Sequence, residues 1–155
     1  GEPFDCTKKN SKNWVARYNP ITKSEQTLFD QPLSFDDRVP FCVYDQMQLS
    51  PDGTLLYLVS PVYATSGSLA IVKLPSGQVH YVPGVNRVYI IEKGPLRGEL
   101  IYQRRQMNLK STDQIVSYPW FHARADGHPI ATVPDLSQFL RKRKGSITID
   151  NKTLP

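Results

Sequence analysis

The chain has little of what marks catalytic or membrane-spanning proteins. It contains two cysteines and three histidines among 155 residues, and no apolar run approaches the roughly 18 residues that cross a bilayer. No glycine-rich segment leads into a helix, as a phosphate-binding loop would require. Ser66-Gly67-Ser68 lacks the strand, Gly-x-Ser-x-Gly and helix of a nucleophile elbow. We therefore expect no membrane span and no enzymatic activity.

The histidines His80, His122 and His128 have no metal-ligand spacing with one another or with the cysteines. The sequence predicts no metal, no cofactor and no catalytic residues. One alternative stays open: a small hydrolase in which His80 or His122 lies beside a serine or carboxylate in a cleft.

The formal charge of +5 is a modest excess. The basic cluster Arg141–Lys144 falls at the end of an expected helix, where cations complement the helix dipole. Nucleic acid is therefore not a predicted partner, and a monomer or weak dimer is expected.

Turn-forming residues are plentiful instead, with 13 prolines and 9 glycines beside 8 tyrosines. Apolar strands flank polar turns in three similar segments, residues 14–29, 69–82 and 118–133, and two further hairpins lie at 43–59 and 85–102. Comparable turns recur about every 50 residues, within the range of propeller blades. Asp135 and Gly145 would bound a helix over 136–144.

We predict an all-β fold with two four-stranded, propeller-blade-like antiparallel sheets, an N-terminal hairpin and one short C-terminal helix. The predicted organisation is a single domain, 1–155. Its parts are an N-terminal hairpin segment (1–38), a first blade (39–84), a second blade (85–134), and a helix with tail (135–155).

Cys6 and Cys42 are compatible with one disulfide and an oxidising compartment. The alternative is a pair of buried thiols in a cytosolic protein. The chain opens with Gly1-Glu2-Pro3 rather than Met, which predicts a removed secretory segment. The expected location is periplasmic or secreted.

The segment Leu49-Ser-Pro-Asp-Gly-Thr-Leu-Leu-Tyr57 resembles the Ser-Pro-Asp-Gly repeat of TolB-type β-propellers. In such repeats the Asp-Gly pair closes the turn between the first two strands of a blade. The second copy, Glu92 to Gly98, departs from the pattern, and two blades cannot close a propeller. The resemblance implies two packed sheets rather than a ring.

Two long connections, 60–68 and 104–112, join the second and third strands of each predicted blade. We expect both to be exposed and to project from the same end of the molecule. They mix apolar or aromatic residues with small hydroxyl residues, which suits a protein contact. The predicted partner-binding residues are Tyr63, Thr65, Ser66, Gly67, Ser68, Arg105 and Asn108.

The order of an N-terminal cysteine segment, a Ser-x-Asp-Gly hairpin and a Ser-Gly-Ser loop is similar to periplasmic immunity proteins against type VI secreted cell-wall amidases. This resemblance implies that Ser66 and Ser68 plug a partner's cleft. The predicted function is thus a non-enzymatic inhibitor or other protein-binding domain. The alternative is a cell-envelope module that binds glycan or peptide beside Tyr102, Tyr118 and Trp120.

Overall fold

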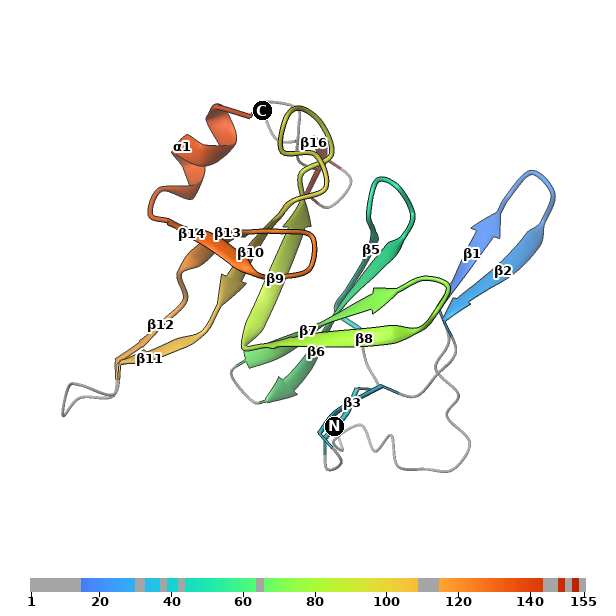
Figure 1. Cartoon of the computed structure of the whole chain (residues 1–155), viewed down its shortest axis with the longest axis horizontal. Coiled ribbons are helices and arrows are strands. Elements are labelled where there is room, and N and C mark those ends of the chain that lie inside the picture. Colours follow the sequence, from blue (N-terminus) through green and yellow to red (C-terminus); the bar gives the residue numbers. More distant parts are fainter. Residues whose placement is uncertain are drawn as a thin grey trace.

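The computed structural model describes residues 15–29, 33–36, 39–41, 44–63, 66–108, 115–143, 148–149 and 152–153. Over these ranges the chain forms antiparallel strands and one short helix near the C-terminus, which confirms the predicted fold class (Figure 1). Cys6 and Cys42 lie outside the described residues, so the predicted disulfide stays a prediction.

Two sheets of four strands form the centre of the molecule. The first contains, in spatial order, β5 (Gln46–Leu49), β6 (Leu55–Tyr63), β7 (Ser66–Lys73) and β8 (Gln78–Pro83). The second contains β14 (Pro129–Val133), β13 (Trp120–Ala123), β10 (Leu100–Arg104) and β9 (Val85–Ile90). The first sheet is built from four consecutive antiparallel strands, as in a propeller blade. In the second, a separate strand pair within residues 106–117 lies between β10 and β13 in the chain.

Smaller elements surround these sheets. The two-stranded pairs are β1 (Val15–Asn19) with β2 (Ser24–Phe29), β3 (Leu33–Asp36) with β4 (Val39–Phe41), β11 (Gln106–Asn108) with β12 (Ile115–Ser117), and β15 (Thr148–Ile149) with β16 (Lys152–Thr153). Helix α1 spans Leu136–Arg141, and the carboxylate of Asp135 accepts the N–H of Gln138 at 2.9 Å, as expected of its N-cap.

Strand alternation sends apolar side chains to both faces of each sheet. One set fills the space between the sheets: Tyr57, Val59, Leu69, Ile71, Val82, Val85, Val88, Ile90, Leu100, Tyr102 and Ala123. On the outer face of the first sheet, Leu56, Leu58, Ala70 and Val72 pack with Val15 and Phe29 of the β1–β2 hairpin. On the outer face of the second sheet, Tyr89, Ile91 and Ile101 pack with Leu136, Phe139 and Leu140 of α1.

The two sheets meet backbone to backbone at a glycine crossing, formed by Gly67 of β7, Gly84 before β9, and Arg105 after β10. The N–H of Gly84 donates to the carbonyl of Gly67 at 3.0 Å, and the N–H of Arg105 donates to the carbonyl of Gly84 at 2.8 Å. A Cβ on Gly67 would lie 2.7 Å from the Val85 carbonyl oxygen and 2.8 Å from that of Ser60. Only glycine allows this approach without moving backbone.

Two glutamines tie the outer strand of the first sheet to the second sheet. The N–H of Val88 in β9 donates to the side-chain oxygen of Gln46 at 3.0 Å, and the side-chain nitrogen of Gln48 donates to the Val88 carbonyl at 3.0 Å. Both backbone groups of Val88, on the last strand of its sheet, are thus satisfied by side chains from β5.

The Ser-Pro-Asp-Gly turn between β5 and β6 is held by one carboxylate. Oδ1 of Asp52 accepts the Ser50 hydroxyl at 2.6 Å, the Thr54 N–H at 3.0 Å and the Thr54 hydroxyl at 2.8 Å. These bonds, that from Ser50 first, lower the pKa of Asp52 from 3.8 to about 2. The turn residues therefore serve the hairpin itself.

We expect an NMR titration of the Asp52 carboxyl carbon to give a pKa of about 2, and Ser50→Ala to raise it toward the ordinary aspartate value. Because the native pKa is depressed, this carboxylate stabilises the fold above about pH 4, and the contribution is lost as the pH falls toward 2. Ser76→Ala, in a different turn, should leave the titration unchanged. A native Asp52 that titrates near pH 4 would contradict this description of the turn.

We expect Gly67→Ala to lower the free energy of unfolding by about 3 kcal/mol, because backbone atoms on both sides of the new methyl group must move. The amide signals of Gly84 and Arg105 should shift with it. Gly94→Ala is the control: its φ of +85° is strained for alanine, but nothing lies within 4 Å of the added carbon. It should cost about 1–2 kcal/mol and leave those signals in place. If Gly67→Ala is as stable as the parent, the crossing does not require glycine.

Candidate functional site

The predicted free loop at 60–68 is wrong in its described part. β6 runs to Tyr63 and β7 begins at Ser66, so most of this segment is paired strand. Ser60, Ser66 and Ser68 are 2%, 7% and 0% exposed. Small residues that suggested a loop open to a partner instead allow the chain to pack closely against itself, and the two serines predicted to plug a cleft are buried.

Gly67, also predicted to contact a partner, likewise packs within the protein itself. It does permit a close backbone approach, but the approaching chain is β9 of the same protein. Its N–H donates to the side-chain oxygen of Asn86 at 2.8 Å. Gly67 therefore joins the two sheets.

The remaining predicted contact residues are only partly described. The backbone of Tyr63 pairs with Ser66, and that of Asn108 pairs with Ile115. Thr65 and the side chains of Tyr63 and Asn108 lie outside the described part of the chain. Arg105 is half-buried, and its Nε is enclosed with no hydrogen-bond partner among the described residues. Its role as a partner contact stays a prediction.

The predicted aromatic groove of Tyr102, Tyr118 and Trp120 does not form. Tyr102 is fully buried between the sheets, whereas Trp120 stacks on Tyr89 on the outer face, with ring centroids 5.8 Å apart. The cause is the alternation of side chains along a strand. Phe121 is paired with Tyr102 and shares its face of the sheet, so Trp120, next to Phe121 in the chain, lies on the opposite face. Tyr118 is 39% exposed and lies in the connection between β12 and β13.

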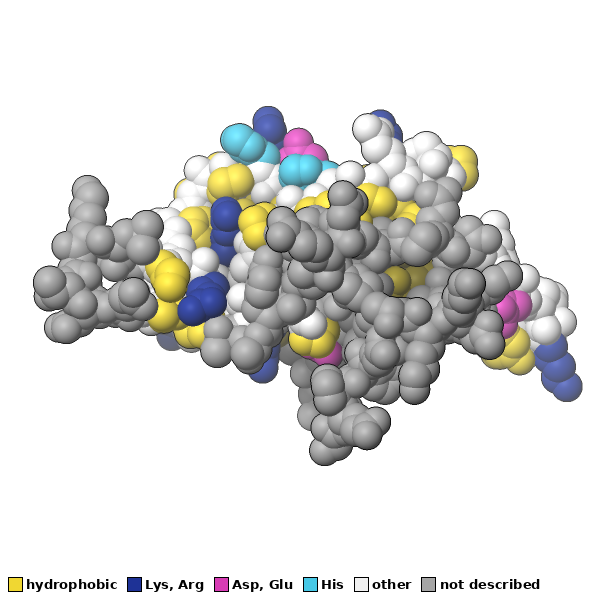
Figure 2. Space-filling model, turned by 90° about the horizontal axis from the view of Figure 1, so that it is seen from below, with side chains coloured by type: hydrophobic (Ala, Val, Ile, Leu, Met, Phe, Trp, Pro, Cys, Tyr) yellow, Lys and Arg dark blue, Asp and Glu magenta, His cyan; other side chains and the backbone are white. Residues whose placement is uncertain are grey.

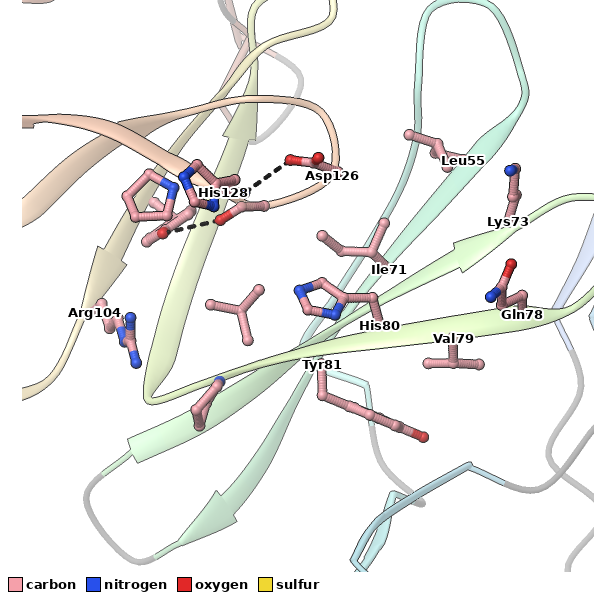
Figure 3. A pocket seen from close by; sticks show the side chains of 15 residues that line it. Leu55, Ile71, Lys73, Gln78, Val79, His80, Tyr81, Arg104, Asp126 and His128 are labelled. Carbon is pink, nitrogen blue, oxygen red and sulfur yellow. Dashed lines mark hydrogen bonds between the residues drawn. The ribbon is translucent and has the colours of Figure 1, made fainter.

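A different groove lies between the two sheets at the edge formed by β8. Its volume is about 680 Å³, within the usual range of ligand sites. We call it the β8 groove. The described residues that line it are Leu55, Ile71, Lys73, Gln78, Val79, His80, Tyr81, Val82, Pro83, Tyr102, Arg104, Asp126, Gly127, His128 and Pro129 (Figure 3).

The groove follows β8 along its whole length, since all six residues of that strand line it. β8 is the last strand of the first sheet in its described part, with β7 as its one neighbour in that sheet. In Figure 3 the imidazole of His80 rises from β8 toward the turn that carries Asp126 and His128. Lys73 and Gln78 lie toward one end and Arg104 toward the other.

The opposite wall is the turn between β13 and β14, which two tyrosines hold in place. The hydroxyl of Tyr57 donates to the carbonyl of Ala125 at 2.8 Å, and that of Tyr102 donates to the carbonyl of Gly127 at 3.2 Å. Tyr57 belongs to the first sheet and Tyr102 to the second, so both sheets fix the turn. Burial, with smaller effects of the Asp52 and Asp126 carboxylates, raises the pKa of Tyr57 well above its ordinary value.

Gly127 brings this turn onto the first sheet. Its φ is +86°, and a Cβ there would lie 2.8 Å from Ile71 Cδ1 and from Val82 Cγ2. The backbone of Gly127 in the second sheet's turn therefore packs directly against apolar side chains of the first sheet, next to β8. All three residues of this contact, Gly127, Ile71 and Val82, line the groove.

The charged side chains of the groove are mostly cationic or protonatable. Its described lining contains two cations, Lys73 and Arg104, and one carboxylate, Asp126. The lining histidines His80 and His128 are both exposed. Figure 2 shows two histidines gathered with acidic and basic side chains above a band of hydrophobic ones. The arrangement offers an apolar floor with polar groups along its rim.

The third histidine lies elsewhere. Nε2 of His122 contacts Oε2 of Glu99 in a short hydrogen bond, and its ring lies 5.5 Å from that of Phe139 in α1. A smaller hollow of about 280 Å³ adjoins it, lined also by Thr132, Lys142 and Arg143. The expectation that a histidine could lie beside a carboxylate is met here, while no serine lines this hollow among the described residues.

Within the described ranges, no three His, Cys, Asp or Glu residues gather as a metal site. The one helix found there is too short to cross a membrane.

No protein-family model, curated protein or solved structure matches the chain. The resemblances to TolB-type repeats and to periplasmic immunity proteins therefore stay predictions.

Sequence reasoning missed the β8 groove because its walls come from residues far apart in the chain. In the sequence His80 and His128 are isolated histidines, and nothing in their spacing predicts that they line one groove. One signal was present: both flank a glycine turn of a predicted hairpin, at Gly77 and Gly127. Two such hairpins in packed blades place their turns and outer strands near one another.

Proposed function

We propose that the protein is a non-enzymatic binding domain that holds an extended segment of a partner protein in the β8 groove. The observation that carries this proposal is a groove of about 680 Å³ that runs beside all of β8 and is walled by a turn fixed from both sheets. The groove takes the place of the 60–68 segment as the contact.

The length of the groove suits an extended chain. Six residues of a strand span roughly 20 Å at about 3.3 Å per residue, and a peptide laid alongside would have a similar number of residues. Apolar side chains of the partner would meet Leu55, Ile71 and Val82, while its polar groups would reach His80 and Gln78. A wall already held by two tyrosine hydroxyls reduces the ordering cost of binding.

The lining favours binding over catalysis. The described groove residues include no serine, threonine or cysteine that could act as a nucleophile beside His80 or His128. An inhibitor or immunity protein that holds a secreted cell-wall hydrolase is the concrete form that the sequence resemblance adds to this proposal.

We further propose that the protein acts in the periplasm or outside the cell, on the basis of a disulfide between Cys6 and Cys42. Alkylation of the denatured, unreduced protein should then leave its mass unchanged, while alkylation after reduction should add two groups. Two added groups without reduction would remove the support for this location.

The groove is tested by selecting a displayed library of random dodecapeptides on the immobilised chain and titrating the enriched peptides into isotope-labelled protein. We expect amide signals of residues 78–82 and 125–128 to shift. His80→Ala should weaken binding by about tenfold, which corresponds to roughly 1.4 kcal/mol, whereas Gln26→Ala on the exposed β1–β2 hairpin should not change it.

Selection of no peptide, or of peptides that shift signals elsewhere, would refute the proposal. Peptidoglycan fragments that shift the groove signals when no peptide does so would favour the glycan-binding alternative.

A further inference from the structure

The described β8 groove carries more positive than negative charge. Lys73 from β7 and Arg104 from β10 are cations, and Asp126 in the β13–β14 turn is the one carboxylate among the described lining residues. Oδ1 of Asp126 accepts the N–H of His128 at 2.9 Å, and Oδ2 lies 3.6 Å from Nη2 of Arg124. The Asp126 carboxylate thus already has partners within its own turn: the His128 N–H and the Arg124 guanidinium, whose positive charge offsets its negative charge.

The two histidines make this balance depend on pH. Histidine is the side chain that ordinarily changes charge between pH 5 and 8. His80 on β8 and His128 after the turn are both exposed, and both line the groove. With neutral imidazoles the lining has two cations against one carboxylate, and with protonated imidazoles four cations against the same carboxylate.

The other groups that face these histidines do not oppose this change. Tyr81 on β8 and Tyr102 on β10 are phenols, and burial raises the pKa of Tyr102, so its ring stays uncharged. β6 contributes Leu55. The charged residues of the lining are Asp126, Lys73 and Arg104, and Arg124 lies beside Asp126. A second carboxylate, Asp52, lies in the β5–β6 turn outside the lining, where its hydrogen bonds go to Ser50 and Thr54.

We propose that the segment bound in the β8 groove is acidic, with carboxylates that alternate with apolar side chains, and that binding tightens as His80 and His128 gain protons. This inference rests on the proposed function, since it names the chemistry of the segment held by the same groove. Alternation follows from the extended conformation, in which successive side chains point to opposite sides: one side meets the apolar floor and the other the cationic rim.

The test compares two labelled hexapeptides with blocked ends, one of alternating Val and Glu and one of alternating Val and Gln, by fluorescence anisotropy at pH 7.5 and pH 5.5. Glutamate remains mostly ionised at the lower pH. We expect the Glu peptide to bind more tightly than the Gln peptide at both values. Its Kd should fall about fivefold at pH 5.5, as two exposed ion pairs of about 0.5 kcal/mol each would give.

The double variant His80→Gln/His128→Gln should remove this pH dependence, while His122→Gln, which changes the histidine outside the groove, should retain it. Raising the salt concentration should weaken the Glu peptide more than the Gln peptide. In parallel, the dodecapeptide selection repeated at pH 5.5 should enrich Asp and Glu.

The outcomes separate the two proposals. If selected peptides shift the groove signals but are neutral or basic, or if the Glu and Gln peptides bind equally at both pH values, the acidic ligand is refuted and the peptide-binding function stands. If no peptide from either selection reaches the groove, the function itself fails, and this inference fails with it. Retention of the pH dependence in the double variant would overturn the role of the two histidines.

Discussion

The structure depends on how closely two β-sheets can approach where β7 meets β9. At Gly67 the carbonyl oxygens of Val85 and Ser60 both lie within 3 Å of where a side chain would begin. That space is closed to every other residue. Because the backbones touch there, Gly84 can bridge the Gly67 carbonyl and the Arg105 N–H, and the two sheets are held at a fixed separation around one apolar core. Packing of side chains alone would leave their relative position less well defined.

This crossing determines where the second sheet's turn falls. The glutamine pair on β5 fixes β9 from one side, and the glycine crossing fixes it from the other. The β13–β14 turn then reaches across to the first sheet, where Gly127 contacts Ile71 and Val82, and the hydroxyls of Tyr57 and Tyr102 hold it. The β8 groove is thus a consequence of sheet packing, and its wall is held by hydrogen bonds from both sheets.

Local patterns in the sequence predicted the strands, their hairpins and the cap at Asp135, because alternation, glycine turns and capping act over a few residues. They failed at 60–68. Serine and glycine favour exposed loops on average, but here Ser68 is fully buried and Gly67 accommodates a strand 18 or more positions away. The groove was beyond prediction for the same reason: packing between the sheets brings His80 and His128 to the lining of one groove, and no spacing in the chain indicates this. Both the burial of the described part of 60–68 and the formation of the β8 groove depend on contacts between residues far apart in the sequence.

The faces of the two sheets explain why a contact with a partner belongs at an edge. In a propeller each blade face is covered by the next blade. Here the outer face of the first sheet packs against Val15 and Phe29, and that of the second against α1, where Phe139 lies under the guanidinium of Arg143 at 3.6 Å. The inner faces cover one another. With the apolar faces of both sheets packed in the described part of the chain, the surfaces left for recognition are strand edges and turns. The β8 groove combines one of each, and it does so where cationic and protonatable side chains gather, which is why it carries the functional proposal.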